Sequence, residues 1–105
     1  MSVSNLTGQN FDEFVSGAGV TVVDFWADWC APCRAMKPIV ESLGSELGGK
    51  VKVGLVDIEE ECGLAGSQSV SSLPHFNIYK DGKIVDTIAG ALPPALFKKR
   101  VAQYI

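Results

Sequence analysis

The fold is decided by the stretch VVDFWADWCAPCRAMKP, residues 22–38. It overlaps the run VTVVDFWA (20–27), whose β-branched and aromatic residues are typical of a central strand buried on both faces. Beyond Cys30 the apolar residues recur at spacings of three and four, which predicts a helix with one buried stripe. The stripe consists of Met36, Ile39, Val40, Leu43 and Leu47. The segment therefore predicts a strand that passes directly into a helix, with two cysteines at the junction.

Outward from this segment, the chain continues to alternate between strand and helix patterns. The other predicted elements are a short strand (2–6), a helix from Asn10, a buried strand (51–58), a short helix (around 60–69), a hairpin (75–90) and a last helix from Pro93-Pro94. This order predicts an α/β fold in which helices cover both faces of a mixed sheet.

Local signals mark where several of these elements begin and turn. Asn10 and Glu13 have the spacing of a capping box, so Asn10 is the predicted N-cap of the first helix. Asp81-Gly82 between two β-rich runs predicts a tight hairpin turn. In the last helix, the residues expected to face inward are Leu96, Phe97, Val101 and either Tyr104 or Ile105.

Length and composition limit the function. The chain has 105 residues, 47% hydrophobic and 20% charged, which fits one globular domain over residues 1–105. A net charge of −3 gives no basis for nucleic-acid binding. No apolar run approaches the roughly 18 residues that a membrane span needs, and the first residues lack the pattern of a targeting signal. We therefore expect a cytoplasmic protein that binds neither nucleic acid nor membrane.

Cys30 and Cys33 bracket Ala31-Pro32 where the strand gives way to the helix. The first turn of a helix offers unpaired N–H groups and the positive end of its dipole, and both favour a thiolate. A lowered pKa would make Cys30, the cysteine nearer solvent, a nucleophile at neutral pH. Cys33 would then attack the mixed disulfide and release the product. Pro32 suits this position because it fixes φ and has no N–H to leave unpaired.

Other interpretations of the cysteines are open. A structural zinc site needs four ligands, and only Cys62 and His75 could join the pair. Two inert buried thiols are a further alternative, although cysteines at a helix start are of the reactive kind. A lone Cys-x-x-Cys beside a strand–helix pattern favours redox chemistry. The third cysteine, Cys62, is interpreted either as a half-buried residue of the short helix or as a secondary regulatory thiol or dimer link.

Asp24 is a carboxylate within an otherwise apolar strand. A buried carboxylate is costly unless it is paired, hydrogen-bonded or neutralised. The apolar residues on both sides of Asp24 argue against the alternative that it reaches solvent at a strand edge. Trp26 belongs to the strand and is expected in the core. Trp29 lies beyond the strand, so we expect it to form a flat apolar surface beside the cysteines.

Residues 22–38 resemble the signature of the thioredoxin family nearly end to end. The matching positions are Asp24, Trp26, Trp29, Cys30, Pro32, Cys33 and Pro38. The similarity continues through SLPHF, where Pro74 corresponds to the family's cis-proline, and through YKDGKIV to Gly90 of IAGAL. It covers essentially the whole chain. It implies the thioredoxin fold, a central mixed five-stranded sheet flanked by four helices in three α/β/α layers.

The resemblance implies a protein-disulfide reductase and dithiol electron carrier, a thiol–disulfide oxidoreductase with no bound cofactor or metal. Cys30 would attack a substrate disulfide, Cys33 would resolve the mixed disulfide, and Asp24 beneath Cys33 would assist proton transfer. The residues expected to tune the pair are Trp29, Ala31, Pro32, Pro74 and His75, and those expected to bind substrate are Trp29, Ala31, Leu73, Pro74, Gly90 and Ala91. The implied partners of this expected monomer are disulfide-containing proteins and a recycling reductase, typically the NADPH-dependent flavoprotein thioredoxin reductase.

Four residues depart from the family pattern. Ala31 replaces the usual glycine, Arg34 replaces the usual lysine, and His75 stands where threonine is common. Leu55 stands where many members carry a lysine beside the buried aspartate, so we expect the Asp24 pKa to lie above the ordinary value. One hypothesis is that His75 lies near Cys30 and tunes its thiolate. The alternative is a surface or strand-edge histidine with no role.

Three competing functions are less well matched. Oxidase- and isomerase-type relatives usually carry a polar residue between the cysteines, whereas this chain has Ala31-Pro32. A glutaredoxin is disfavoured because the two tryptophans and Asp24 fit the thioredoxin pattern. A non-enzymatic binding module would use the same surface with the cysteines incidental. Loss of insulin reduction on Cys30→Ser would separate a carrier from such a module.

Overall fold

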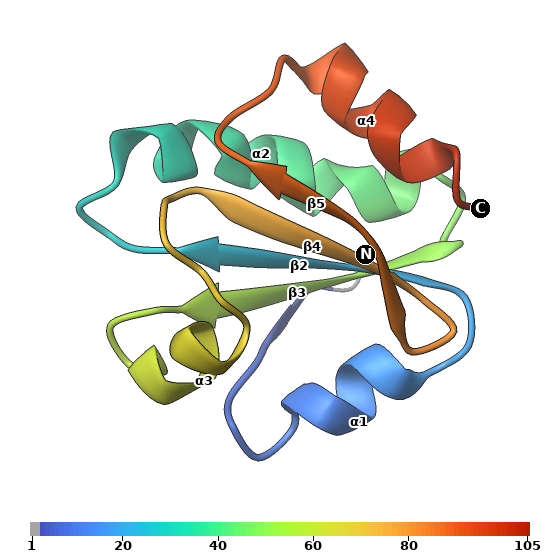
Figure 1. The fold of residues 1–105 in the computed structure, drawn as a ribbon. Helices are drawn as coiled ribbons and strands as arrows, with labels where there is room; N and C mark the ends of the chain where they lie inside the picture. The colour runs from blue at the N-terminus through green and yellow to red at the C-terminus, as the bar shows by residue number, and fades with distance from the viewer. Residues whose placement is uncertain (1–2) are drawn as a thin grey trace.

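The computed structural model describes residues 3–105, in which five strands form one sheet and four helices pack against it (Figure 1). The strands are β1 (Val3–Asn5), β2 (Val20–Trp26), β3 (Val51–Asp57), β4 (His75–Lys80) and β5 (Lys83–Ala89). The helices are α1 (Phe11–Ser16), α2 (Ala31–Glu46), α3 (Cys62–Ser67) and α4 (Pro94–Ala102). α2 and α4 cover one face and α1 and α3 the other, which confirms the predicted three layers. Ser2, the first residue of the strand predicted over 2–6, lies outside the described residues.

The strand order β1-β3-β2-β4-β5 places β2 at the centre of a mixed sheet, as predicted. β2 pairs in parallel with β3 and antiparallel with β4, so Asp24 lies opposite Leu55 on one side and Phe76 on the other. β4 pairs antiparallel with β5, with a register shift that leaves Val85 without a partner across the ladder. Within residues 3–105, no helix has the length and apolar character needed to cross a membrane.

Successive residues of β2 point to opposite faces of the sheet and enter two different hydrophobic clusters. Val22 packs in the cluster that includes α2 and α4 residues, whereas Val23 and Phe25 pack in the cluster on the α1 and α3 side. Asp24 shares the parity of Val22, so its side chain faces α2. This alternation determines on which side of the sheet each polar residue of the redox site lies.

Most predicted element limits are confirmed, and two details are wrong. Asp81 and Gly82 form the hairpin turn with φ of 51° and 87°, the left-handed values that a two-residue turn requires. Asn10 precedes α1 but caps no helical N–H, because its Oδ1 accepts from the backbone N–H of Thr7 at 2.7 Å. Leu96 does not face inward; it is 53% exposed, since α4 packs through Phe97.

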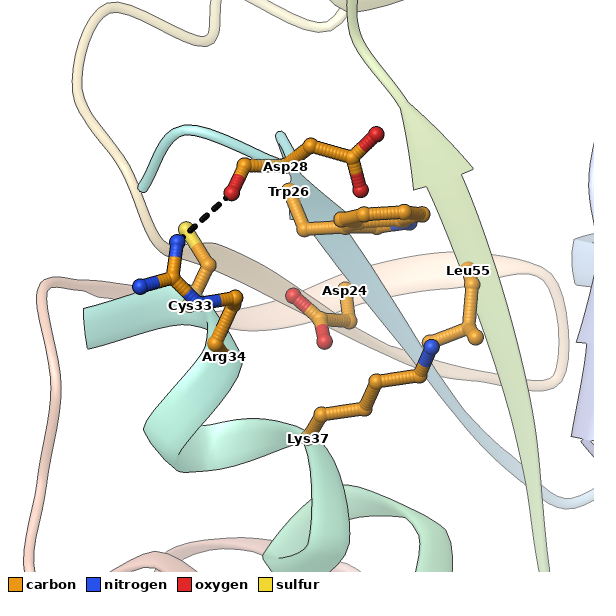
Figure 2. Close-up of a pocket in the computed structure, with 7 residues that line it drawn as sticks. All are labelled: Asp24, Trp26, Asp28, Cys33, Arg34, Lys37 and Leu55. Atoms are coloured by element: carbon orange, nitrogen blue, oxygen red, sulfur yellow. Dashed lines mark hydrogen bonds between the residues drawn. The ribbon is translucent and has the colours of Figure 1, made fainter. Parts of the chain in front are cut away.

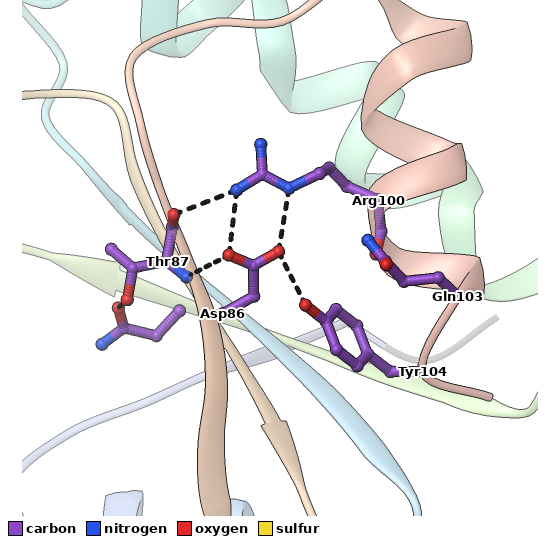
Figure 3. A network of polar contacts seen from close by, with 6 residues as sticks. Asp86, Thr87, Arg100, Gln103 and Tyr104 are labelled. Carbon is purple, nitrogen blue, oxygen red and sulfur yellow. Dashed lines mark hydrogen bonds and ion pairs between the residues drawn. The ribbon is translucent and has the colours of Figure 1, made fainter.

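Asp86 fastens β5 to α4 through a network of polar contacts (Figure 3). Its carboxylate accepts from Arg100 Nε at 2.8 Å and Nη2 at 2.9 Å, and from the Tyr104 hydroxyl at 3.0 Å. It also accepts from the backbone N–H of Thr87 at 2.8 Å. These donors, Arg100 above all, lower the pKa of Asp86 from 3.8 to about 2. The carboxylate is therefore held in its charged form by a bidentate partner.

Candidate active site

β2 and α2 bring the two cysteines to one end of the sheet. β2 ends at Trp26 and α2 begins at Ala31, with Cys30 as its N-cap. The Cys30 sulfur accepts a hydrogen bond from the backbone N–H of Cys33 at 3.2 Å. One of the otherwise unpaired donors of the first helical turn thus points at this sulfur, which favours its thiolate. Pro32 occupies the first turn, where a missing N–H removes no helical hydrogen bond.

Cys30 and Cys33 form a disulfide, with their Cα atoms 5.2 Å apart. Cys30 is 6% exposed and Cys33 2%, so Cys30 is the cysteine nearer solvent, as predicted. Because the two sulfurs are bonded to each other, neither is available as a zinc ligand in this structure. Cys62 is free and exposed, so its interpretation as a half-buried residue is wrong.

A groove of about 450 Å³ lies beside the disulfide. Trp29 is 64% exposed, and its Nε1 donates to Glu59 Oε2 at 2.9 Å, which holds the ring in place. The groove is therefore walled by a large, fixed aromatic surface next to Cys30. Its lining residues are Trp29, Cys30, Ala31, Pro32, Ile58, Val70, Ser71, Ser72 and Leu73.

The remaining residues predicted to bind substrate adjoin this groove without lining it. Pro74 follows Leu73 through a cis peptide bond. The backbone N–H of Gly90 donates to the Pro74 carbonyl at 2.8 Å, so the end of β5 is tied to the segment beside the groove. Ala91 follows Gly90 and is exposed. The structure thus places Trp29, Ala31 and Leu73 in the groove and the other three next to it.

Asp24 lies in a second pocket, of about 180 Å³, which Cys33 also lines (Figure 2). The residue is 1% exposed, and its Oδ1 has no hydrogen-bond partner among residues 3–105. Burial raises the pKa of Asp24 from 3.8 to about 7, and the charge of Lys37 acts in the opposite direction. The expectation of a raised Asp24 pKa is therefore confirmed. The pocket is lined by Asp24, Trp26, Asp28, Cys33, Arg34, Lys37 and Leu55.

His75 lies on β4 and faces the α1 and α3 side, away from the Asp24 pocket. It is 7% exposed and packs edge-on against Phe25 with ring centroids 5.5 Å apart. Its Nε2 shares a hydrogen bond of 2.9 Å with Asn77 Oδ1, and Asn77 in turn donates to the Tyr79 hydroxyl. The surface or strand-edge interpretation is wrong, because β4 lies inside the sheet and the ring is buried. The influence of His75 on Cys30 stays a prediction.

The thioredoxin family model matches residues 2–103 of the chain. The chain belongs to the thioredoxin family. It is 35% identical over 105 residues to thioredoxin of Bacillus subtilis, which covers both chains completely. It is 37% identical over 100 residues to thioredoxin 2 of Chlorobaculum tepidum, covering 94% of this chain and 92% of that one.

Solved structures of thioredoxins have the same fold. A crystal structure of thioredoxin from Malassezia sympodialis superposes with a TM-score of 0.88 at 30% identity, covering 99% of this chain and 94% of that one. A mutant thioredoxin from Halobacterium salinarum superposes with a TM-score of 0.90 at 28% identity, covering 98% and 90%. The thioredoxin fold expected from the sequence is confirmed.

As a thioredoxin with this disulfide, the protein is a thiol–disulfide oxidoreductase and a dithiol electron carrier. Cys30, at the helix N-cap, attacks a substrate disulfide, and Cys33 resolves the mixed disulfide that forms. The redox group is the Cys30–Cys33 pair, and no cluster of potential metal ligands occurs within the described part of the chain. Family membership implies two kinds of partner, disulfide-containing substrates and a reductase that recycles the carrier.

Sequence reasoning missed several residues of this thioredoxin site. Ile58 and Val70 line the groove, and Ile58 could have been found because it follows a buried strand at the cysteine end of the sheet. Glu59 could not have been found, since its bond to Trp29 joins two loops. Lys37 had a readable signal, because it follows Cys33 by four residues on the same helix face.

Proposed function

We propose that this thioredoxin reduces protein disulfides with Asp24 as the general base that takes the proton of the Cys33 thiol. The observation that carries the proposal is the unpartnered Oδ1 of Asp24, in a side chain 1% exposed and in the same pocket as Cys33. A buried carboxylate without a partner is costly to the fold. A role as proton acceptor for the resolving cysteine accounts for a buried carboxylate whose Oδ1 has no hydrogen-bond partner among residues 3–105.

The proposed reduction proceeds through two successive thiol–disulfide exchanges. The Cys30 thiolate attacks one sulfur of the substrate disulfide, which forms a mixed disulfide and releases the first substrate thiolate. Asp24 accepts the Cys33 proton as the Cys33 sulfur attacks Cys30, and the second substrate thiolate leaves. The protein has then given two electrons to the substrate and holds the Cys30–Cys33 disulfide. Asp24 finally returns its proton to solvent.

A pKa of about 7 suits Asp24 to this role. A general base is most effective when its pKa lies near the working pH, because it must both accept and release the proton. At neutral pH about half of the Asp24 carboxyl groups are ionised and able to accept the Cys33 proton. The same carboxyl group can return a proton to Cys33 when the disulfide is reduced.

We assign substrate binding to the groove beside Cys30 and to the residues that adjoin it. The substrate backbone would pair with the segment before Pro74, in the way an extended peptide adds to an exposed backbone edge. The exposed ring of Trp29 would supply apolar contact area at the groove wall. The full proposed set is Trp29, Ala31, Leu73, Pro74, Gly90 and Ala91.

We assign the tuning of the redox pair to the residues around its loop. Ala31 restricts the backbone more than glycine would, and Pro32 fixes φ between the cysteines. Trp29, Pro74 and His75 complete the proposed set through their place at the same end of the sheet. What supports these three residues is their position in the sequence. Trp29 precedes Cys30, Pro74 follows the groove residue Leu73, and His75 follows Pro74.

The cellular setting is also part of the proposal. The reductase would be the NADPH-dependent flavoprotein thioredoxin reductase, and the substrates would be disulfide-containing proteins. The protein would act in the cytoplasm as a monomer, as a single domain over residues 1–105, without nucleic-acid or membrane partners. Its family membership and its net charge of −3 support this setting.

Reduction of insulin by dithiothreitol tests the proposal. Cys30→Ser should abolish the catalysed rate, because no nucleophile remains. Asp24→Asn should slow the reaction about a hundredfold at neutral pH, the lower end of the range for loss of a general base. Asp12→Asn, an exposed aspartate on α1, is the matched control and should keep the wild-type rate. Equal rates for Asp24→Asn and the wild type across the pH range would contradict the general-base role.

A further inference from the structure

The Asp24 pocket contains one lysine, and it comes from the helix rather than from the neighbouring strand. On β3 the residue opposite Asp24 is Leu55, which is 5% exposed and carries no charge. From α2, Lys37 lines the same pocket as Asp24 and Cys33. We propose that Lys37 is a positioning residue for the resolving step, whose ammonium group keeps Asp24 available as a carboxylate. This inference rests on the proposed role of Asp24 as general base.

Helix geometry places Lys37 over the strand that carries Asp24. Lys37 follows Cys33 by four residues, so the two side chains leave α2 on the same face. Figure 2 shows the Lys37 side chain extending from α2 in the direction of Leu55. Its Nζ lies 5.2 Å from the centroid of the Trp26 ring. Trp26 lies two residues after Asp24, so both side chains are on the same face of β2. The cation–π contact with Trp26 therefore holds the Lys37 ammonium group over β2, the strand that carries Asp24.

The other charged groups around the pocket do not supply this cation. Arg34 Nη1 donates to the backbone carbonyl of Asp28 at 2.7 Å, which directs the guanidinium toward the loop before α2. Asp28 on that loop and Asp57 at the end of β3 are acids, and a nearby negative charge disfavours a second one. The residues that β3 and β4 place opposite Asp24 are both apolar. Lys37 is therefore left as the cation that opposes the effect of burial on Asp24.

The size of the effect follows from the ionisation of Asp24. Removal of an opposite charge near a carboxyl should raise its pKa by about 1. With a wild-type pKa of about 7, the ionised fraction of Asp24 at neutral pH would fall from about one half to about one tenth. A resolving step that needs the carboxylate would slow about fivefold. The difference should vanish at about pH 9, where both proteins are mostly ionised.

The experiment compares Lys37→Gln, Lys37→Arg and the control Lys83→Gln, which removes an exposed lysine at the hairpin end of the sheet. NMR titration of the Asp24 carboxyl carbon measures its pKa. Stopped-flow reduction of a nitrobenzoate disulfide separates the steps: the first coloured thiolate is released by Cys30 and the second by Cys33. Lys37→Gln should raise the Asp24 pKa and slow only the second release about fivefold at neutral pH. Lys37→Arg and Lys83→Gln should match the wild type.

Two results would overturn the inference: an unchanged Asp24 pKa in Lys37→Gln, or a Lys37→Arg protein as slow as Lys37→Gln. The second result would mean that the amine's shape, and not its charge, matters. Failure of the general-base proposal gives a different pattern. In that case Asp24→Asn would release the second thiolate at the wild-type rate, while the Asp24 pKa would still rise in Lys37→Gln.

Discussion

Asp24 and Asp86 are the same side chain in opposite surroundings. Asp24 on β2 is buried with an unpartnered Oδ1, and burial raises its pKa to about 7 (Figure 2). Asp86 on β5 accepts hydrogen bonds from Arg100, Tyr104 and Thr87, and its pKa falls to about 2 (Figure 3). The Asp86 carboxylate, which ties β5 to α4, is surrounded by hydrogen-bond donors. The Oδ1 of Asp24, in the pocket that Cys33 lines, has no donor within the described part of the chain. A carboxyl left without donors stays able to exchange a proton near neutral pH.

The two carboxyl groups make opposite contributions to the pH dependence of stability. Asp24 binds its proton more tightly in the folded state, so stability falls as pH rises from 3.8 through about 7. Asp86 binds its proton less tightly in the folded state, so its contribution is complete above 3.8 and is lost as pH falls through about 2. From these two groups alone, the protein should be most stable near pH 4.

The sharpest test of this comparison is Asp24→Asn. The wild-type free energy of unfolding should fall by about 4 kcal/mol between about pH 4 and pH 8, from the difference between 3.8 and about 7. Asparagine does not ionise, so the variant should lack this fall and should exceed the wild type in stability at the higher pH. Urea unfolding at both pH values measures the effect. Asp12→Asn should retain the wild-type fall, and a fall of the same size in Asp24→Asn would refute the raised pKa.

A smaller effect is expected from Leu55→Lys, which should lower the Asp24 pKa and so bring it closer to that of Asp86. Leu55 lies opposite Asp24 across the β2–β3 ladder, so an ammonium group there would favour the carboxylate. The Asp24 pKa should fall by about 1, which corresponds to about 1.4 kcal/mol. NMR titration measures the shift, and Leu55→Met serves as an uncharged control of similar length. An unchanged pKa in Leu55→Lys would show that charge at this position does not reach the carboxyl.

The smallest effect is expected from Asp86→Asn. The Arg100 and Asp86 side chains are 39% and 17% exposed, so their ion pair is partly screened. Its loss should lower the free energy of unfolding by about 1 kcal/mol at neutral pH. The loss should shrink toward pH 2, because wild-type Asp86 is then protonated as well. Urea unfolding across this range provides the measurement. A loss that stayed constant in acid would assign the effect to the geometry of the network instead of to charge.

Local patterns predicted the elements that carry the redox site. β2 and α2 each have a strong periodic signal, and Asp81-Gly82 supplies a turn signal that depends on only two residues. The sequence does not decide the hydrogen bonding of Asn10, because an asparagine before a helix can bond forward to the helix or backward to the loop. The exposure of Leu96 is not readable from the sequence, because Leu96 and Phe97 are adjacent apolar residues and only the packing of α4 decides which of them faces the core.

The site was predictable where it depended on sequence spacing and not where it depended on register. The burial of Asp24 followed from the two-residue period of its strand, and the place of Cys30 followed from the strand–helix junction. The contact of Lys37 with the Trp26 ring depends on how α2 lies over β2. The Asp86–Arg100 pair depends on the register of β5 and the placement of α4, which no local pattern encodes.

The register shift in β5 also bears on the behaviour of the protein at high concentration. β5 forms an outer edge of the sheet, and both Ile84 and Val85 are exposed there. A regular apolar edge strand is a template on which a second chain can add its own strand. The unpaired Val85 interrupts that regularity, because an extra residue bends the strand and breaks the spacing of its N–H and C=O groups. The register shift in β5 is therefore expected to disfavour edge-to-edge pairing of this strand with a second copy of the chain.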